Sequence, residues 1–220
     1  MATATANAEK NLANARELFD GFLKSTFNKK GEGWLSKRLD EVCSLINGRA
    51  YKKEELLNLG KYPVLRVGNL FTNEHWYHSD LELDYDKYCD NGDLLYAWSA
   101  SFGPRIWAGK KVIYHYHIWK VLPDPAIIDK QFLFHLLAWD VDEIKQAHGT
   151  GATMMHISKG SMEGRIVPIP PLKNQHQIVE QFEKLKRETQ RLEVIYQQKL
   201  VALEQLKKSI LHQAFTGKLN

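Results

Sequence analysis

The chain has 220 residues, of which 44% are hydrophobic, 11% aromatic and 25% charged, with a net charge of +4. This composition excludes a disordered or fibrous protein, and the small net charge does not by itself indicate a partner. The longest apolar stretch, 132–139, is too short to cross a bilayer, and the N-terminus lacks a basic-then-apolar leader. We therefore expect a soluble cytoplasmic protein. Its two cysteines, Cys43 and Cys89, lie outside any CxxC motif and are expected to be reduced thiols.

The first segment predicts an amphipathic helix over residues 7–28. Leu18, Phe22 and Phe27 recur near helical spacing in a stretch rich in Ala, Leu, Glu and Lys. Gly31 and Gly33 then end the helix and provide a joint to the next segment.

The middle of the chain combines short apolar runs with one longer helical pattern. The runs predict strands at 63–67, 94–98 and 112–121. In the last of them, alternation places Tyr114 and Tyr116 on one face and His115 and His117 on the other. Helical spacing over 127–144 predicts a helix. This segment is therefore expected to be a mixed α/β domain.

The third segment starts with an extended Pro-rich piece at 168–171, after which a long helix is predicted. Apolar residues at steps of three and four form the seam of a coiled coil. With two residues of the first helix, the predicted helix interface comprises Leu18, Phe22, Ile178, Phe182, Leu185, Leu192, Tyr196, Leu203, Leu206 and Ile210. A helix of roughly 55 Å needs a partner: the first helix, a second copy or another protein.

The whole chain thus reads as three segments, 1–33, 34–170 and 171–220. We predict an α+β fold, in which one mixed α/β domain is flanked by long N- and C-terminal helices that form an antiparallel coiled coil or a dimer bundle. A shift of 188 residues aligns the two helices, matching Leu18 to Leu206, Phe22 to Ile210, Leu23 to Leu211 and Phe27 to Phe215. The match predicts one unit of a larger repeated design.

Several motifs follow one another in a specific order and spacing. They lie at 34–43 (WLSKRLDEVC), 60–66 (GKYPVLR), 92–95 with 101–103, 153–158 (TMMHIS), 169–172 with 175–179, and 206–219. With these motifs the chain resembles half of a specificity subunit of a type I restriction-modification system. It departs from the family at 173–175, where Lys-Asn-Gln replaces the usual Glu-Gln, and in having one target-recognition domain where full-length members have two.

The resemblance implies a protein that recognises DNA and catalyses nothing itself, without a cofactor. In the family, each recognition domain contacts one half of a split double-stranded target, and the helices set the gap between the halves. Methyltransferase (modification) subunits and a motor-nuclease (restriction) subunit dock on this frame. A single-domain form implies a homodimer and a symmetric bipartite target, with no role for a membrane.

Candidate DNA contacts are cationic and small polar residues in expected loops, because base recognition needs directional donors and acceptors while phosphate contacts need cations. They are Lys52, Lys53, Arg66, Ser99, Ser101, Arg105, Lys110, Lys111, Thr150, Thr153, His156 and Lys159.

Two other classes of function compete with this interpretation. One is a coiled-coil interaction protein whose middle domain binds a ligand other than DNA. The other is a Mg²⁺-dependent nuclease using Asp124, Glu143 and Lys145, a pattern that arises easily by chance. Histidines near carboxylates, at 75–80 and 115–117, are ligand types for a metal, but among Tyr and Trp we interpret them as packed, and predict no metal site and no catalytic residue.

Overall fold

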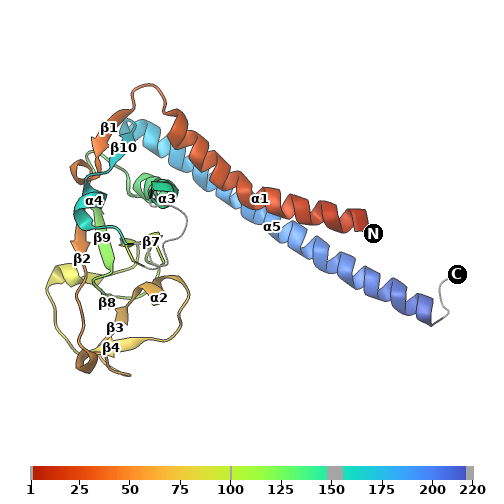
Figure 1. The fold of residues 1–220 in the computed structure, drawn as a ribbon, viewed down its shortest axis with the longest axis horizontal. Helices are drawn as coiled ribbons and strands as arrows, with labels where there is room; N and C mark the ends of the chain where they lie inside the picture. The colour runs from red at the N-terminus through yellow and green to blue at the C-terminus, as the bar shows by residue number, and fades with distance from the viewer. Residues whose placement is uncertain (1, 100, 148–155, 217–220) are drawn as a thin grey trace. The chain divides into compact units, whose positions relative to one another are not determined.

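The computed structural model describes residues 2–99, 101–147 and 156–216. The chain divides into two compact units, unit 1 (Met1–Lys29 and Gln177–Asn220) and unit 2 (Lys30–His176), and most of their helices and strands are labelled in Figure 1. No helix in the described ranges is long and apolar enough to span a membrane.

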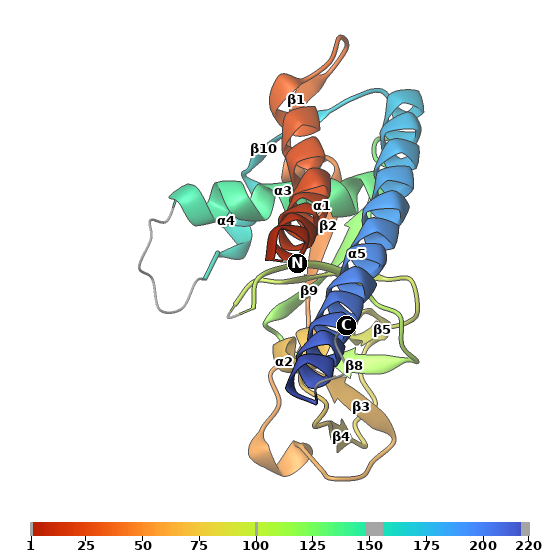
Figure 2. The same cartoon turned by 90° about the vertical axis from the view of Figure 1, so that its right-hand side faces the viewer.

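Unit 2 is built on three small sheets (Figure 1 and Figure 2). The first pairs β1 (Leu35–Arg38) antiparallel with β10 (Ile166–Ile169). The second is antiparallel, with the order β2 (Cys43–Asn47), β9 (Ile118–Pro123), β6 (Leu94–Ala97) and β7 (Gly103–Ile106). The third has the order β4 (Tyr77–Ser79), β3 (Tyr62–Leu65), β8 (Val112–Tyr114) and β5 (Tyr88–Cys89), and only its β3–β8 pair is parallel.

Helices connect and cover these strands. The α-helices of unit 2 are α2 (Val67–Phe71), α3 (Lys130–Ala147) and α4 (Lys159–Glu163), and the 3₁₀ turns are η1 (Leu39–Glu41), η2 (Lys53–Glu55) and η3 (Tyr85–Lys87). Helix α3 begins after Asp129, whose Oδ1 accepts hydrogen bonds from the backbone N–H groups of Gln131 and Phe132. This capping by an Asp side chain satisfies two of the free N–H groups of the first turn.

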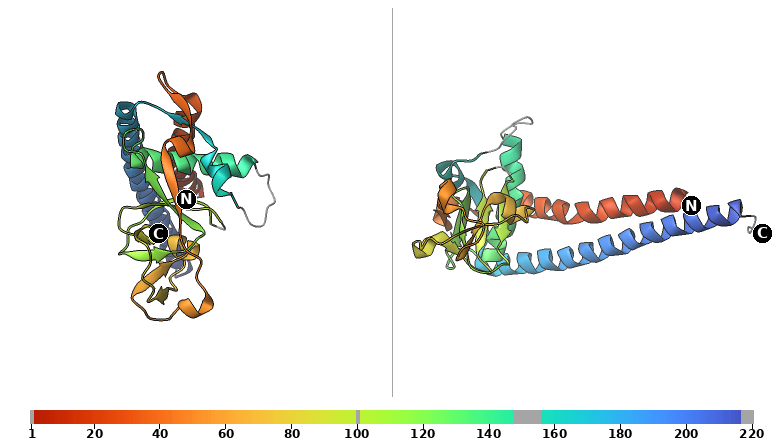
Figure 3. Two further views of the ribbon diagram at one scale, coloured as in Figure 1. Left: turned by 90° about the vertical axis from the view of Figure 1, so that its left-hand side faces the viewer. Right: turned by 90° about the horizontal axis from the view of Figure 1, so that it is seen from below.

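Unit 1 consists of α1 (Ala2–Lys29) and most of α5 (Leu172–Phe215), which run antiparallel side by side (Figure 3). Phe182 of α5 is fully buried, with the rings of Phe19, Phe22 and Phe27 at centroid distances of 6.1, 5.6 and 6.0 Å. The buried residues of α1 are Ala8, Leu12, Ala15, Leu23 and Phe27. Small alanines at two of these positions allow the helices to approach closely.

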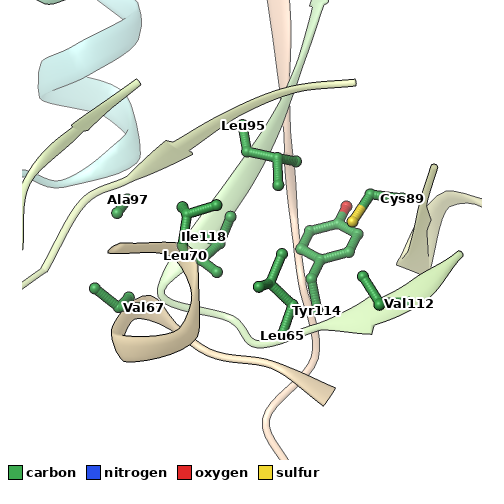
Figure 4. Packing of buried hydrophobic residues seen from close by; sticks show 9 residues of the cluster. All are labelled: Leu65, Val67, Leu70, Cys89, Leu95, Ala97, Val112, Tyr114 and Ile118. Carbon is green, nitrogen blue, oxygen red and sulfur yellow. The ribbon is translucent and has the colours of Figure 1, made fainter. Parts of the chain in front are cut away.

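The two four-stranded sheets and α2 contribute to one core cluster of unit 2 (Figure 4). It contains Leu65, Val67, Leu70, Cys89, Leu95, Ala97, Val112, Tyr114 and Ile118. The hydroxyl of Tyr114 donates to the carbonyl of Asp86 at 2.7 Å, so this large buried side chain keeps its polar group satisfied. Both cysteines are free and buried.

Two buried polar side chains tie α3 and its N-terminal loop to distant segments of unit 2. Asp140 of α3, 2% exposed, forms a bidentate ion pair with Arg165 just before β10. Gln175, fully buried, accepts from the backbone N–H of Asp129 and donates to the carbonyls of Ile127 and Pro170.

The predicted strand at 112–121 is wrong. Strand β8 ends at Tyr114 and β9 begins at Ile118 in a different sheet. The N–H of Ile118 donates to the carbonyl of His115 at 2.9 Å, which closes a turn over 115–117. Alternation of aromatic and histidine residues imitated a continuous strand, whereas tertiary hydrogen bonds reverse the chain there. The other predicted elements occur with shifted ends: 63–67 as β3 followed by α2, 94–98 as β6, and 127–144 as α3.

Candidate nucleic-acid interface

The turn formed by His115, Tyr116 and His117, the histidine turn, is held by neighbouring backbone on several sides. The N–H of His115 donates to the carbonyl of Leu65 at 2.9 Å, and that of Tyr116 donates to the carbonyl of Arg49 at 3.0 Å. A Cβ at Gly48 would lie 2.4 Å from the carbonyl oxygens of Tyr114 and His115. Only glycine therefore permits this approach, and the turn is rigidly positioned.

A pocket of about 350 Å³ lies beside this turn, lined by Arg66, Val67, Gly68, Asn73, His115 and His117. Arg66, at the N-terminal end of α2, places its guanidinium over the ring of Tyr77 at 4.4 Å from the centroid. Its Nε is buried and has no hydrogen-bond partner among the described residues. A buried donor without a partner is costly unless a ligand or solvent satisfies it.

Trp98 joins the histidine turn to the segment that follows the undescribed residues 148–155. Its backbone N–H donates to the carbonyl of His117 at 3.1 Å, and its indole Nε1 donates to the carbonyl of Tyr116 at 2.8 Å. The indole ring contacts those of His117 and His156 at centroid distances of 4.9 and 6.0 Å. Ser99, next in the chain, forms an isolated β-bridge with His156. Three histidines and a tryptophan thus lie together.

The histidines of the turn are uncharged near neutral pH. Burial lowers the pKa of His115 to about 4, with smaller effects from His117 and Arg66. Burial and the nearby His156 also lower the pKa of His117. Neutral imidazoles offer one donor and one acceptor each, which suits base recognition better than charge attraction.

The structure brings together part of the predicted DNA-contact set. Arg66 lines the pocket, and Ser99 and His156 lie beside Trp98. Arg105 of β7 places its guanidinium 4.3 Å from the ring centroid of Phe71 in α2, the helix that starts after Arg66. The remaining members lie elsewhere or cannot be placed: Ser101 is exposed before β7, and Thr150 and Thr153 lie outside the described residues.

The predicted lysines have other surroundings. Lys52 and Lys53 are exposed and follow Tyr51, whose ring stacks on that of His115 at 6.3 Å. The remaining lysines have these contacts: Lys110 lines a separate hollow with Trp76 and Trp107, Lys111 lies over the ring of Tyr88 at 4.5 Å, and Lys159 pairs with Glu163 at 3.5 Å.

Sequence reasoning missed His115, His117, Trp98 and Asn73 as site residues. The two histidines were assigned to packing in a strand, because the turn depends on contacts with residues 48–49, which are distant in sequence. No local pattern marks Asn73, which reaches the pocket only through the turn after α2. The one signal in the sequence was Trp98, an aromatic residue next to the predicted contact Ser99, which could have indicated that Trp98 belongs to the site.

The residues of the nuclease pattern lie in two different segments of unit 2. Asp124 Oδ1 accepts the N–H of Ala126 at 2.9 Å in the turn after β9, and Glu143 lies on α3. In the described ranges, no three or more His, Cys, Asp or Glu residues are grouped to hold a metal ion. His75 packs edge-on against Tyr77 at 5.0 Å, and the backbone of His78 pairs with that of Leu57.

The predicted helix-interface residues differ in their burial within unit 1. Phe22 and Phe182 are in contact, whereas Leu18 and Leu206 are each 50% exposed. Leu18 and Leu185 line one groove between the helices. The other predicted members, Ile178, Leu192, Tyr196, Leu203 and Ile210, are partly buried.

Known proteins resemble this chain in sequence over most of its length. A sequence model of the type I restriction modification DNA specificity domain matches residues 31–204. The specificity subunit of the type I restriction enzyme EcoBI from Escherichia coli is 24% identical over 191 residues, covering 86% of this chain and 40% of that protein.

Solved structures show the same fold. A chain from a type I R-M system superimposes with a TM-score of 0.77 at 19% identity, covering 98% of this chain and 56% of that one. The HsdS subunit from Thermoanaerobacter tengcongensis gives 0.71 at 21% identity, covering 97% of this chain and 54% of that one. The predicted α+β fold with long flanking helices is confirmed.

A mixed α/β domain with two long helices is therefore the architecture that this chain shares with the solved structures. The chain belongs to the family of type I restriction-modification DNA specificity domains, as its motifs indicated. It spans less than half the length of the EcoBI subunit.

Proposed function

We propose that unit 2 recognises one half of a bipartite double-stranded DNA target. The observation that carries this proposal is the histidine turn with its pocket, where Arg66, His115 and His117 offer directional polar groups on a backbone held by tertiary hydrogen bonds. Side chains fixed in this way can distinguish base edges, whereas mobile surface cations attract only the phosphate backbone. The exposed Lys52 and Lys53 suit the second role.

The chain itself performs recognition, and the chemistry is supplied by partner subunits. The family membership supports docking of methyltransferase and motor-nuclease subunits on a frame that includes α1 and α5. The protein is proposed to act in the cytoplasm, where these partners and DNA are found together. The competing nuclease function would need metal ligands, and the described part of the chain has no group of three or more His, Cys, Asp or Glu residues that could hold a metal ion.

Unit 1 supports pairing with a second copy of the chain. Helix α5 carries large apolar side chains that α1 does not cover: Val201 is 51%, Leu206 50% and Leu211 46% exposed. A second α5 would cover this apolar surface, and the pair would recognise a symmetric split target.

Mapping of methylated sites in genomic DNA, with the cognate methyltransferase subunits present, tests the recognition role. We expect a split motif, palindromic if two copies pair, and binding that weakens steeply with added salt. Loss of methylation at that motif on deleting this chain completes the test. Salt-insensitive binding without preference among duplexes would favour the coiled-coil protein with another ligand.

The mass of the purified chain in solution tests the pairing. We expect a dimer at micromolar concentration, and dissociation in Leu211→Asp, because a carboxylate in an apolar seam must be desolvated. Leu59→Asp is the matched control, since Leu59 is 84% exposed in unit 2. A monomeric wild-type chain, or equal behaviour of the two variants, would contradict pairing through α5.

A further inference from the structure

We infer that the pocket between α2 and the histidine turn holds the major-groove edge of a guanine in the DNA target. This inference rests on the proposed function and assigns one base to one site. Its basis is the hydrogen-bonding character of three lining side chains, Arg66, His115 and Asn73. They present donors, and the acceptors of His115 and Asn73 are engaged.

Arg66 provides the first donors. Its guanidinium lies over the ring of Tyr77, 4.4 Å from the centroid, which restricts where the planar fork can lie. Arg66 lines the pocket, and its Nε is buried without a hydrogen-bond partner in the described ranges, so this donor is available to a ligand. An arginine held in this way matches two adjacent acceptors of one base.

His115 provides a second donor. Its Nδ1 accepts the backbone N–H of His117 at 3.5 Å, and the pKa of the ring is lowered to about 4 by burial. A neutral imidazole whose Nδ1 accepts a hydrogen bond carries its hydrogen on Nε2. The free nitrogen of His115 is therefore a donor.

Asn73 completes the set. Its Oδ1 accepts the backbone N–H of His75 at 2.8 Å, so its acceptor is used within its own turn and its amide NH₂ remains. The pocket thus combines a guanidinium, an imidazole N–H and an amide NH₂.

Base chemistry then selects guanine. In the major groove guanine presents two acceptors, O6 and N7, whereas adenine and cytosine each present an amino donor and thymine presents a methyl group beside one acceptor. An amino donor facing these lining donors would leave buried groups unpaired. A phosphate also offers only acceptors, so the experiment must separate a guanine from the DNA backbone.

The experiment selects bound duplexes from a random pool with the full chain in complex with its methyltransferase subunits. We expect the wild type to select a motif containing a guanine, and Arg66→Lys and His115→Phe to lose preference at that same position. Discrimination there should fall by about 5- to 150-fold. Arg38→Gln is the matched control, because Arg38 lies at the end of β1, pairs with Asp40 of η1 and does not line the pocket.

Chemically altered duplexes distinguish the two acceptor sources. Replacing the guanine by 7-deazaguanine removes N7, and we expect weaker binding of the wild type but no further loss in Arg66→Lys. Uncharged methylphosphonate linkages at the same step should affect wild type and variant equally. The guanine site is overturned if 7-deazaguanine weakens wild type and Arg66→Lys equally while methylphosphonates weaken only the wild type. It is also overturned if the variants lose affinity for all duplexes without a change of motif. Either result leaves DNA recognition intact. A wild-type complex that selects no motif overturns both proposals.

Asn73→Asp gives an independent check. The carboxylate keeps an oxygen for the N–H of His75 but replaces the amide donor by an acceptor. We expect the preference for guanine at that position to weaken toward bases with an amino group. An unchanged motif in this variant would contradict the proposed donor set of Arg66, His115 and Asn73.

Discussion

The two units of this protein differ in how completely they bury their apolar and polar side chains. Unit 2 surrounds a core shared by two sheets, and it provides partners for the buried polar side chains of Asp140 and Gln175. Unit 1 is a pair of helices with a narrow seam around Phe182, and it leaves several large apolar residues of α5 exposed. Unit 2 is thus internally complete, while unit 1 offers surface for association. The same substitution, Gly to Ala, should therefore lower the stability of unit 2 and raise that of unit 1.

The largest effect is expected from breaking the buried ion pair of unit 2. Arg165→Met leaves the carboxylate of Asp140 buried, where burial already raises its pKa against the opposing effect of Arg165. The free energy of unfolding should fall by about 3–5 kcal/mol. All six tryptophans lie in unit 2, so denaturant unfolding followed by tryptophan fluorescence reports on it.

The matched control for this variant is Arg38→Met, which breaks the solvent-exposed pair with Asp40 and should change the free energy of unfolding far less. Equal losses in the two variants would show that the Arg165 pair is not special. The double variant Asp140→Leu with Arg165→Met should recover much of the stability, since no charge is then left buried.

A smaller loss is expected from adding one methyl group at the histidine turn. Gly48→Ala places a Cβ 2.4 Å from two carbonyl oxygens, so the backbone must shift, at a cost of about 1–3 kcal/mol. Specific DNA binding should weaken along with stability, because the shift moves His115. Unchanged fluorescence melting would mean that the turn adapts without strain.

The same substitution in unit 1 should have the opposite sign. Gly21 lies inside α1, and nothing lies within 4 Å of the position a Cβ would take. Gly21→Ala should therefore stabilise the helix by about 0.5–1 kcal/mol. Far-UV circular dichroism during thermal unfolding measures this change, and a lower melting temperature would contradict the prediction.

The smallest effect concerns pH. His115 has a pKa of about 4 in the folded chain, below the ordinary value of 6.5. Between these values the unfolded chain binds the extra proton, so this stabilising contribution is full above pH 6.5 and is lost as the pH falls toward 4. The melting temperature should drop less between pH 7 and 5 in His115→Gln than in the wild type. If the melting temperatures of the two proteins fall in parallel with pH, titration of His115 is not the cause of the loss of stability.

Helices and several strands of this chain are predictable from sequence because their signals are local. Apolar spacing indicates α1, α3 and α5, and short apolar runs indicate β3 and β6. Local spacing failed for the seam of α1, where Leu18 is half exposed and Ala15 is buried. Alanine carries no strong apolar signal, yet it fills the seam because the partner helix lies close.

The candidate site shows the same limit. Arg66, Ser99 and His156 were expected from residue type and loop position, whereas the pairing of Gly48 and Arg49 with the histidine turn joins residues more than sixty positions apart. No periodicity within 112–121 reports a hydrogen bond to residue 49. Which of the many polar loop residues share a pocket is therefore not encoded in any local pattern.

The order of the three segments, the family and the two long helices follow from the sequence alone, because periodicity and motif spacing are properties of neighbouring residues. Tertiary structure alone decided that 115–117 is a turn, that its histidines are neutral, and that Arg66 and Asn73 face them across one pocket. These features depend on burial and on contacts between distant segments, which exist only once the chain is folded.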